Sequence, residues 1–441
     1  MSQLLKIGQM IFTDSSDTPC EVEKFLGDGG QGEVYQARLG NSRVAIKWYF
    51  PHYLKEDPEL RERLEMAIKR GAPTDRFLWP QDMVSATDDD ATFGYVMPLR
   101  EPRFKSLNDM MAGRIHPTFR AVATAGFELA HSYSQLHAKG LCYKDINFGN
   151  VFLDPQNGEI RVCDNDNVDV NGAIGAIGGT QGFMAPEVER QEAAPTTQTD
   201  LHSLAVLLFY MFMMHHPLSG KKELEIHCFD MAAKRKLYGT HPLFIFDPND
   251  NGNPPVSGEQ DNPLTFWPLY PQALRNLFTR AFTDGLHDPN KRIREDEWKK
   301  MMVRLRDSII YCGGCGNENF YDGEALKSSG SQLRSCWSCG KEPKLPPRIR
   351  IGGEVIMLNH DAMLYPHHLE QDKKYDFASP LAAVNRNPND GRWGLKNLGG
   401  DKWTAAYPDG RIVDVESGKT VPIPTGIKIN FGRAEGEIRL G

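Results

Sequence analysis

The sequence lacks an apolar run long enough to cross a membrane. Its longest helical apolar stretch, 201–214, is interrupted by His202 and Ser203, whereas a spanning helix needs about 20 apolar residues. The first residues also lack a basic region followed by an apolar core and a small-residue cleavage site. We therefore expect a cytoplasmic location and no membrane partner.

The chain also lacks a strong excess of charge of either sign. It has 51 Lys and Arg against 58 Asp and Glu, a net charge of −7 over 441 residues. That balance leaves no overall electrostatic footprint for nucleic acid, so no nucleic-acid partner is expected. With 40% hydrophobic and 25% charged residues, the composition is typical of a soluble globular protein.

Cysteines are few, and half of the eight gather in two Cys-x-x-Cys pairs. Their spacing excludes a secreted disulfide framework and fits a zinc site with four thiolate ligands, Cys312, Cys315, Cys336 and Cys339. A closed site of this kind leaves no position for substrate, which predicts a structural Zn²⁺ in a small ribbon at 308–345. The alternative is a cluster of reduced surface thiols.

A glycine-rich segment, Gly27-Asp28-Gly29-Gly30-Gln31-Gly32-Glu33-Val34, precedes the strand-like Val44-Ala45-Ile46-Lys47. Glycines let a backbone turn tightly and approach phosphate groups closely. Lys47 brings a cation into an apolar strand. Taken separately, the two motifs could be an ordinary hairpin and an edge lysine.

About a hundred residues downstream, Tyr143-Lys144-Asp145-Ile146-Asn147-Phe148-Gly149-Asn150 is followed by Asp164. The four motifs occur in the order of a protein kinase, and residues 20–305 resemble the protein kinase catalytic domain. The resemblance implies that Asp145 accepts the proton of the attacking hydroxyl, with Lys47 and Asn150 as the other catalytic residues. It implies an ATP and Mg²⁺ site made of Gly27, Gly29, Gly32, Val34, Lys47, Glu62, Met97, Arg100, Asn150 and Asp164.

Within that site, the resemblance gives each residue a role. Asn150 and Asp164 are expected to bind Mg²⁺, and Lys47 to pair with the α- and β-phosphates. Its helix partner is predicted to be Glu62, because Met66 then supplies an apolar residue one turn further on, and Glu65 is the second choice. Met97 is expected to guard the adenine pocket.

Further motifs match the same family. By analogy, Glu187 is expected to pair with Arg292, and Asp200 to tie the catalytic loop to the central helix. A plain N-cap is the alternative role for Asp200. The segment from Gly179 to Glu187 resembles a substrate-docking loop.

Several positions depart from the family pattern. Asp164-Asn165-Asp166 replaces Asp-Phe-Gly, and Lys144 replaces the arginine before the catalytic aspartate. Asn147 stands where serine/threonine kinases usually have a lysine. Between Asn165 and Gly179 the chain has no Ser, Thr or Tyr, so phosphorylation of this loop is not expected as a switch.

We predict an α+β architecture of three parts: a bilobal kinase-like domain at 1–307, the zinc ribbon at 308–345, and a β-sandwich at 346–441. Helices are expected at 59–70 and 118–139, and short strands follow residue 346. The end of the chain resembles the last strands of a forkhead-associated (FHA) domain. That resemblance rests on Gly394-Leu395-Lys396-Asn397-Leu398, Tyr407-Pro408-Asp409-Gly410, Val421-Pro422-Ile423-Pro424 and Ile427-Lys428-Ile429-Asn430-Phe431-Gly432.

The predicted function is transfer of the γ-phosphate of ATP to Ser or Thr of a partner protein. The whole architecture resembles bacterial kinases of tellurium-resistance-type stress modules. The implied partners are a von Willebrand factor A protein as substrate and a metal-dependent protein phosphatase. The alternative is a nucleotide-binding pseudokinase scaffold, which Asn165-Asp166 favours. A small-molecule kinase is a third reading, kept open by Asn147.

Overall fold

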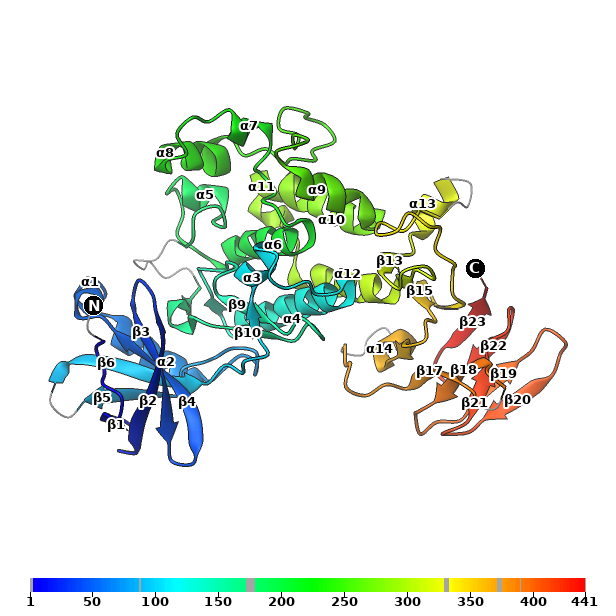
Figure 1. Ribbon diagram of the computed structural model, residues 1–441, viewed down its shortest axis with the longest axis horizontal. Coiled ribbons are helices and arrows are strands. Elements are labelled where there is room, and N and C mark those ends of the chain that lie inside the picture. The colour runs from blue at the N-terminus through cyan, green and yellow to red at the C-terminus, as the bar shows by residue number, and fades with distance from the viewer. Residues whose placement is uncertain are drawn as a thin grey trace. The chain divides into compact units, whose positions relative to one another are not determined.

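The computed structural model describes residues 3–86, 89–171, 179–328, 333–370, 375–388 and 390–440. The chain divides into two compact units (Figure 1). The first is Met1–Trp267 with Arg275–Lys300, and the second is Pro268–Leu274 with Met301–Gly441. The cysteine segment and the C-terminal strands therefore belong to one unit.

The first unit begins with a closed antiparallel barrel in the order β1-β2-β3-β4-β6-β5. Alternating buried side chains such as Val22, Tyr35 and Ile46 fill its interior, as the two-residue period of a strand requires. The strands are β1 (Met10–Thr13), β2 (Pro19–Asp28), β3 (Gly32–Leu39), β4 (Ser42–Tyr49), β5 (Asp82–Ala86) and β6 (Asp89–Pro98).

Helix α2 (Leu60–Arg70) follows β4 and buries Leu60, Leu64 and Ala67. Leu60 and Leu64 pack with Ala45, Tyr49 and other side chains of the barrel. The expected helix at 59–70 is thus present, and its apolar face is the one turned inward. A shorter helix, α1 (Pro51–Glu56), precedes it.

Helices and short strands make up the rest of the first unit. Helix α4 begins after Thr118, whose side chain accepts a hydrogen bond from the Ala121 N–H. The helices are α3 (Leu107–Met111), α4 (Phe119–Ala138), α5 (Pro186–Glu189), α6 (Thr197–Met213), α7 (Lys221–Leu224), α8 (Met231–Lys234), α9 (Asp261–Phe266), α10 (Gln272–Phe282), α11 (Asp284–His287) and α12 (Glu295–Asp307). The strands are β7 (Lys105–Ser106), β8 (Leu141–Cys142), β9 (Val151–Leu153), β10 (Ile160–Val162) and β11 (Asp169–Val170). The ends of α10 and α12 reach into the second unit.

The N-terminus of α6 differs from the plain N-cap alternative for Asp200. Thr196 is the N-cap and forms a capping box with Thr199. Asp200 comes one residue after Thr199 and does not cap the helix. Its carboxylate can therefore accept hydrogen bonds from elsewhere.

The second unit contains a hairpin of β12 (Ile309–Tyr311) and β13 (Glu318–Phe320) and two antiparallel sheets. The sheets share one core that includes Ile349, Leu395, Trp403 and Ile429. One sheet has the order β15-β14-β23-β22-β19-β20, and the other β16-β17-β18-β21. Their elements, with the short helices of this unit, are α13 (Gly323–Ser328), β14 (Arg348–Ile351), β15 (Glu354–Met357), β16 (Met363–Leu364), α14 (Pro366–Leu369), β17 (Ala382–Arg386), β18 (Trp393–Asn397), β19 (Trp403–Ala406), β20 (Ile412–Val415), β21 (Thr420–Pro422), β22 (Lys428–Asn430) and β23 (Glu435–Arg439).

Candidate active site

A cavity of about 690 Å³ lies in the first unit, beside the glycine-rich turn between β2 and β3. It is lined by most of the predicted site residues: Gly27, Gly29, Gly32, Val34, Lys47, Met97, Arg100, Asp145 and Asp164. Sequence reasoning missed other lining residues, among them Gln31, Ala45, Leu78, Phe152 and Asn167. Strand periodicity could have found Ala45, because it lies two residues before Lys47 and so shares its face.

The glycines of the turn differ in how closely other atoms surround them. A Cβ on Gly32 would lie 2.2 Å from the Trp48 carbonyl oxygen, so this glycine is required where β3 meets β4. A Cβ on Gly27 or Gly29 would meet nothing within 4 Å. Gly32 therefore serves the close approach of two strands, and Gly27 and Gly29 leave open space beside the cavity.

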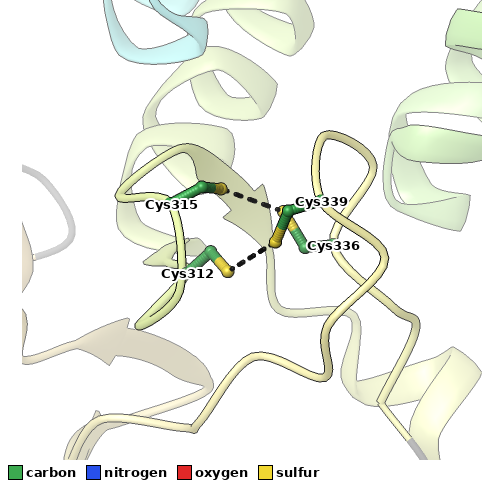
Figure 2. A group of neighbouring side chains, drawn as sticks. All are labelled: Cys312, Cys315, Cys336 and Cys339. Atoms are coloured by element: carbon green, nitrogen blue, oxygen red, sulfur yellow. Dashed lines mark hydrogen bonds between the residues drawn. The ribbon is translucent and has the colours of Figure 1, made fainter.

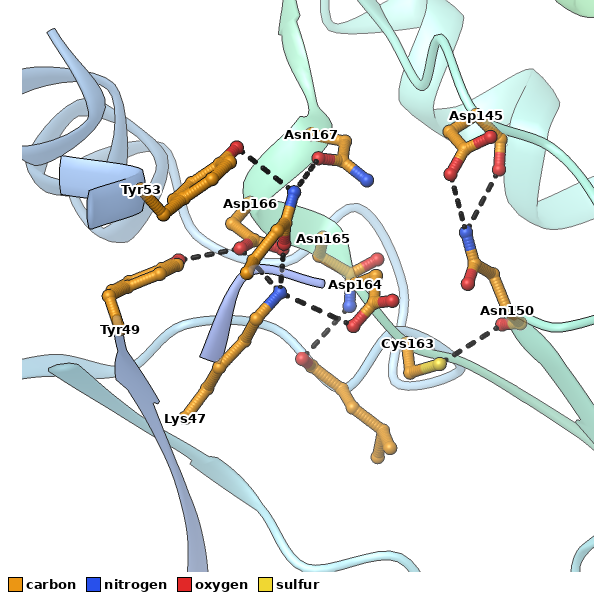
Figure 3. Close-up of polar contacts among 12 residues, drawn as sticks. Lys47, Tyr49, Tyr53, Asp145, Asn150, Cys163, Asp164, Asn165, Asp166 and Asn167 are labelled. Atoms are coloured by element: carbon orange, nitrogen blue, oxygen red, sulfur yellow. Dashed lines mark hydrogen bonds and ion pairs between the residues drawn. The ribbon is translucent and has the colours of Figure 1, made fainter. Parts of the chain in front are cut away.

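Lys47 projects from β4 into the site with only 6% of its side chain exposed. Its Nζ lies 2.7 Å from Asp166 Oδ2 and 3.5 Å from Asp164 Oδ1, and it also donates to Gln31 (Figure 3). Burial opposes the charged form, but the two carboxylates outweigh it and raise the pKa of Lys47 above its usual value. The lysine is therefore a fixed cation at the wall of the cavity.

The predicted pairing of Lys47 with Glu62 does not form in this structure. Glu62 is exposed on α2, and Glu65, the second choice, is also exposed and pairs with Arg61 at 3.2 Å. The prediction assumed that Met66 would supply the inward apolar residue, but Met66 is 44% exposed. The inward face consists of Leu60, Leu64 and Ala67 instead.

A tight turn, 164–167, follows β10 and holds the carboxylates that face Lys47. Asp164 has a left-handed backbone (φ 51°), which is costly for a residue other than glycine. Asn165 is fully buried and donates to the carbonyl oxygens of Leu78 (2.9 Å) and Val162 (3.1 Å). In place of an aromatic side chain, this position thus supplies two hydrogen bonds that anchor the turn.

Asp145 and Asn150 come together in the loop after β8. Asn150 is buried, and its Nδ2 donates to the backbone oxygen of Asp145 (3.0 Å) and to its carboxylate (3.2 Å). The amide oxygen of Asn150 is the atom left to ligate a cation. Thr180 donates its hydroxyl hydrogen to Asp145 Oδ1 at 2.6 Å and accepts from Asn147 Nδ2 at 3.0 Å. Asn147 therefore supports a hydroxyl group that is bound to Asp145.

Asp200 and Lys144 hold this loop in place. The Asp200 carboxylate accepts from the backbone N–H groups of Tyr143 (2.6 Å) and Lys144 (3.0 Å) and contacts His137 at 3.1 Å. Lys144 Nζ pairs with Asp169 at 2.8 Å, and only 4% of the lysine side chain is exposed. Residues 164–169 thus supply a carboxylate to each of the two buried lysines of the site.

Glu187 and Arg292 form the ion pair implied by the family resemblance, with Nη2 and Oε2 at 2.8 Å. Only 2% of the Arg292 side chain is exposed. Gly179 and Thr180 are described, but the segment 172–178 lies outside the described residues.

The residues of the cavity fit a nucleotide with Mg²⁺. The open glycine turn and the buried lysine suit phosphate groups, and 43% of the Asp164 side chain is exposed and can reach a cation. The carboxylate of Asp164 and the amide oxygen of Asn150 are the oxygen ligands that Mg²⁺ prefers.

The second unit holds the four cysteines as predicted, with all their sulfur atoms within 4.8 Å of one another (Figure 2). Cys312 lies 3.6 Å from Cys339, and Cys315 lies 3.7 Å from Cys336. Two matching turns present them: Gly316 N–H donates to the Cys312 carbonyl, and Gly340 N–H to that of Cys336, both at 2.8 Å. Both glycines have positive φ, which only glycine adopts without strain.

The local environment favours the thiolate form of Cys336 but not of Cys339. The Lys341 N–H lowers the pKa of Cys339, but burial and hydrogen bonds with the other cysteines outweigh it and raise the pKa to about 11. Burial raises the pKa of Cys336, but backbone N–H groups and Asn319 outweigh it and bring the pKa to about 6. Zinc binds the thiolate form of cysteine. Four sulfur ligands at this spacing fit a tetrahedral structural zinc site in a ribbon.

Comparison with known proteins agrees with this geometry. Residues 20–258, more than half of the chain, match the protein kinase domain. The chain therefore belongs to the protein kinase family.

Among its relatives is CBL-interacting serine/threonine-protein kinase 15 of Arabidopsis thaliana, 26% identical over 47% of this chain and 50% of that protein. Protein kinase MCK1 of Saccharomyces cerevisiae is 23% identical over 58% of this chain and 68% of that protein. The chain thus spans about half the length of the first of these relatives. Both relatives are protein kinases by name, and the first is a serine/threonine-protein kinase.

In the part of the chain that the structure describes, no helix combines the length and the apolar character needed to cross a membrane.

Proposed function

We propose that the protein is an ATP-dependent serine/threonine protein kinase. The observation that carries the proposal is the meeting of Lys47, Asp145 and Asp164 at one cavity, with Asn150 hydrogen-bonded to Asp145. These residues come from segments about a hundred positions apart, and they supply a phosphate-binding cation, a proton acceptor and ligands for Mg²⁺.

In the proposed reaction, the acceptor hydroxyl attacks the γ-phosphorus of ATP. A bond forms between the hydroxyl oxygen and that phosphorus, the bond from the phosphorus to the bridging oxygen breaks and releases ADP, and the proton passes to Asp145. Lys47 would hold the α- and β-phosphates, and Asn150 and Asp164 would hold Mg²⁺. Mg²⁺, when bound, neutralises phosphate charge. Charged groups held in place away from bulk water stabilise the charge of the transition state more strongly than they would in water.

The choice of a hydroxyl acceptor has specific support. Thr180 already places a side-chain hydroxyl 2.6 Å from Asp145 Oδ1. An aliphatic hydroxyl of a protein substrate would have to take the same position to be deprotonated. The name of the Arabidopsis thaliana relative points to the same acceptor class.

One observation favours the second candidate, a nucleotide-binding pseudokinase scaffold. Lys47 has no glutamate of α2 as a partner, and it contacts Asp164, which is needed for the cation. A scaffold would bind nucleotide in the same cavity without transferring phosphate.

Radiolabelled γ-phosphate transfer separates the two functions. The purified full chain would be assayed with Mg²⁺ and ATP on dephosphorylated casein, beside Asp145→Asn and the control Asp75→Asn, a carboxylate that is 81% exposed. Loss of the general base should lower turnover by at least about a hundredfold, whereas Asp75→Asn should stay within about twofold. Absence of transfer by the wild-type chain, with Mg·ATP binding retained, would reject the kinase and support the scaffold.

The finer context rests on the resemblance of the sequence. We propose a cytoplasmic bacterial kinase of a tellurium-resistance-type stress module, with a von Willebrand factor A protein as substrate and a metal-dependent phosphatase as its counterpart. We also propose an FHA-like β-sandwich at 346–441, which the shared core of two antiparallel sheets supports. The remaining proposed boundaries are 1–307 for the kinase domain and 308–345 for the ribbon.

A further inference from the structure

The closest carboxylate to the buried Lys47 belongs to Asp166. The two side chains are 6% and 1% exposed, and their charged atoms lie 2.7 Å apart. The same Asp166 oxygen also accepts from the Tyr49 hydroxyl at 2.6 Å (Figure 3). Two donors from β4, two residues apart on one face, thus converge on one oxygen atom.

Helix α2 offers no competing carboxylate. Its buried residues are Leu60, Leu64 and Ala67, while Glu62 and Glu65 face solvent. Turning either glutamate toward Lys47 would bring buried leucines into water, which costs free energy in proportion to the apolar area exposed. The apolar pattern of the helix therefore opposes the pairing with a helix glutamate that the family pattern implies.

The turn that carries Asp166 is held from several sides. Asn165 bonds to the Leu78 and Val162 carbonyl groups. Gln31, in the glycine-rich turn, contacts both Lys47 and Asn167. Asp166 is therefore fixed relative to β4 and to the glycine-rich turn, which form the walls of the cavity.

We infer that Asp166 is the positioning residue for Lys47 and replaces the helix glutamate in that role. The inference rests on the proposed kinase function and assigns a task to the position where the family pattern has glycine. Asp166 holds the ammonium group extended toward the phosphate side of the cavity. Without this carboxylate, the remaining acid near Lys47 is Asp164, 3.5 Å away, and a closer pair between them would occupy the group needed for Mg²⁺.

Paired variants test this assignment. Asp166→Asn keeps the shape of the side chain but removes its charge, and Glu62→Gln removes the rival. We expect Asp166→Asn to lower turnover at saturating ATP by about tenfold or more. Glu62→Gln and the exposed control Asp75→Asn should stay within about twofold of the wild-type chain. Asp166→Glu, which restores the charge, should recover part of the loss.

Two results would overturn the inference. One is unchanged turnover in Asp166→Asn, and the other is a loss in Glu62→Gln equal to that in Asp166→Asn. A merely structural role for Asp166 predicts equal loss in Asp166→Asn and Asp166→Glu together with a lower melting temperature, and that pattern would also reject it.

Nucleotide binding keeps this test separate from the proposed function. If the wild-type chain transfers no phosphate, the kinase proposal fails, but the affinity for Mg²⁺ with a fluorescent ATP analogue still measures the role of Asp166. Asp166→Asn should then bind about fivefold more weakly, with no change in Glu62→Gln. If Asp166→Asn does not fold, a crystal structure of the wild-type chain with Mg²⁺ and a non-hydrolysable ATP analogue decides. Lys47 should stay within about 3 Å of Asp166, and a move to Glu62 or Glu65 would refute the inference.

Discussion

The cavity lined by Lys47, Asp145 and Asp164 (the cleft) and the cysteine cluster are both built from turns. They differ in how far apart along the chain the interacting residues lie. In the cysteine cluster, each turn is closed by a hydrogen bond over four residues, from Gly316 to Cys312 and from Gly340 to Cys336. In the cleft, Lys47 meets Asp166 across 119 positions, and Asp200 reaches Tyr143 across 57. We therefore expect the cysteine cluster to depend on a bound ion, whereas the cleft depends on the packing of a whole unit.

Removing zinc is expected to have the largest effect, and it should affect the cysteine cluster but not the cleft. Structural zinc contributes about 10–16 kcal/mol to the folding of small zinc-finger peptides, so a zinc-selective chelator or Cys336→Ser should abolish protection from hydrogen exchange in the described part of 309–342. Mg·ATP affinity should change by less than about twofold, because the cleft has its own core. Hydrogen exchange with mass spectrometry and a nucleotide titration measure both.

The exposed Cys228 provides the matched control, and Cys228→Ser should retain protection in the ribbon. Loss of nucleotide binding on chelation would mean that the two sites depend on each other.

A rise in pH should weaken the cleft through His137, which holds Asp200. Burial opposes the charged form of His137, but Asp200 and Glu295 outweigh it and raise its pKa from 6.5 to about 9. Its contribution to stability is therefore complete below pH 6.5 and is lost as pH rises through about 9. We expect the free energy of unfolding of the first unit to fall by roughly 3 kcal/mol over that range, because one pKa unit corresponds to about 1.36 kcal/mol.

Denaturant unfolding of the wild-type chain and of His137→Asn at several pH values checks this effect. The difference between the two chains should shrink as pH rises. A constant difference would show that His137 is not charged in the folded protein.

The smallest effect on turnover is expected from removing any phosphate groups that are covalently attached to the protein. Lys144 is already paired with Asp169 at 2.8 Å, and 165–179 contains no Ser, Thr or Tyr. Treatment with a protein phosphatase, followed by its removal, should leave turnover within about twofold. A tenfold drop in turnover would show that the cleft, unlike the cysteine cluster, needs phosphorylation of the protein.

Local sequence predicted much of the fold. Helix α2 begins one residue after the expected start at 59, and α4 (Phe119–Ala138) lies inside the expected 118–139. Apolar periodicity and capping residues set these elements, because they act over a few residues. The N-cap alternative for Asp200 is wrong, since the Thr196 and Thr199 pair satisfies the first amides of α6 instead.

The cysteine cluster could be predicted completely, whereas the partner of Lys47 could not. A Cys-x-x-Cys pair followed by glycine specifies its own turn. Choosing among Glu62, Glu65 and Asp166 needs the rotation of α2, which depends on which face its leucines bury.

The sequence by itself thus determined the family, the order of the predicted catalytic residues and the four clustered cysteines, because motifs and local turns carry them. Only the tertiary structure decided that Asp166 faces Lys47, that Asp169 faces Lys144 and that Asn165 anchors the turn between them. Those contacts join β4, the loop after β8 and the turn after β10. No short segment encodes their meeting, because burial of distant apolar faces brings them together.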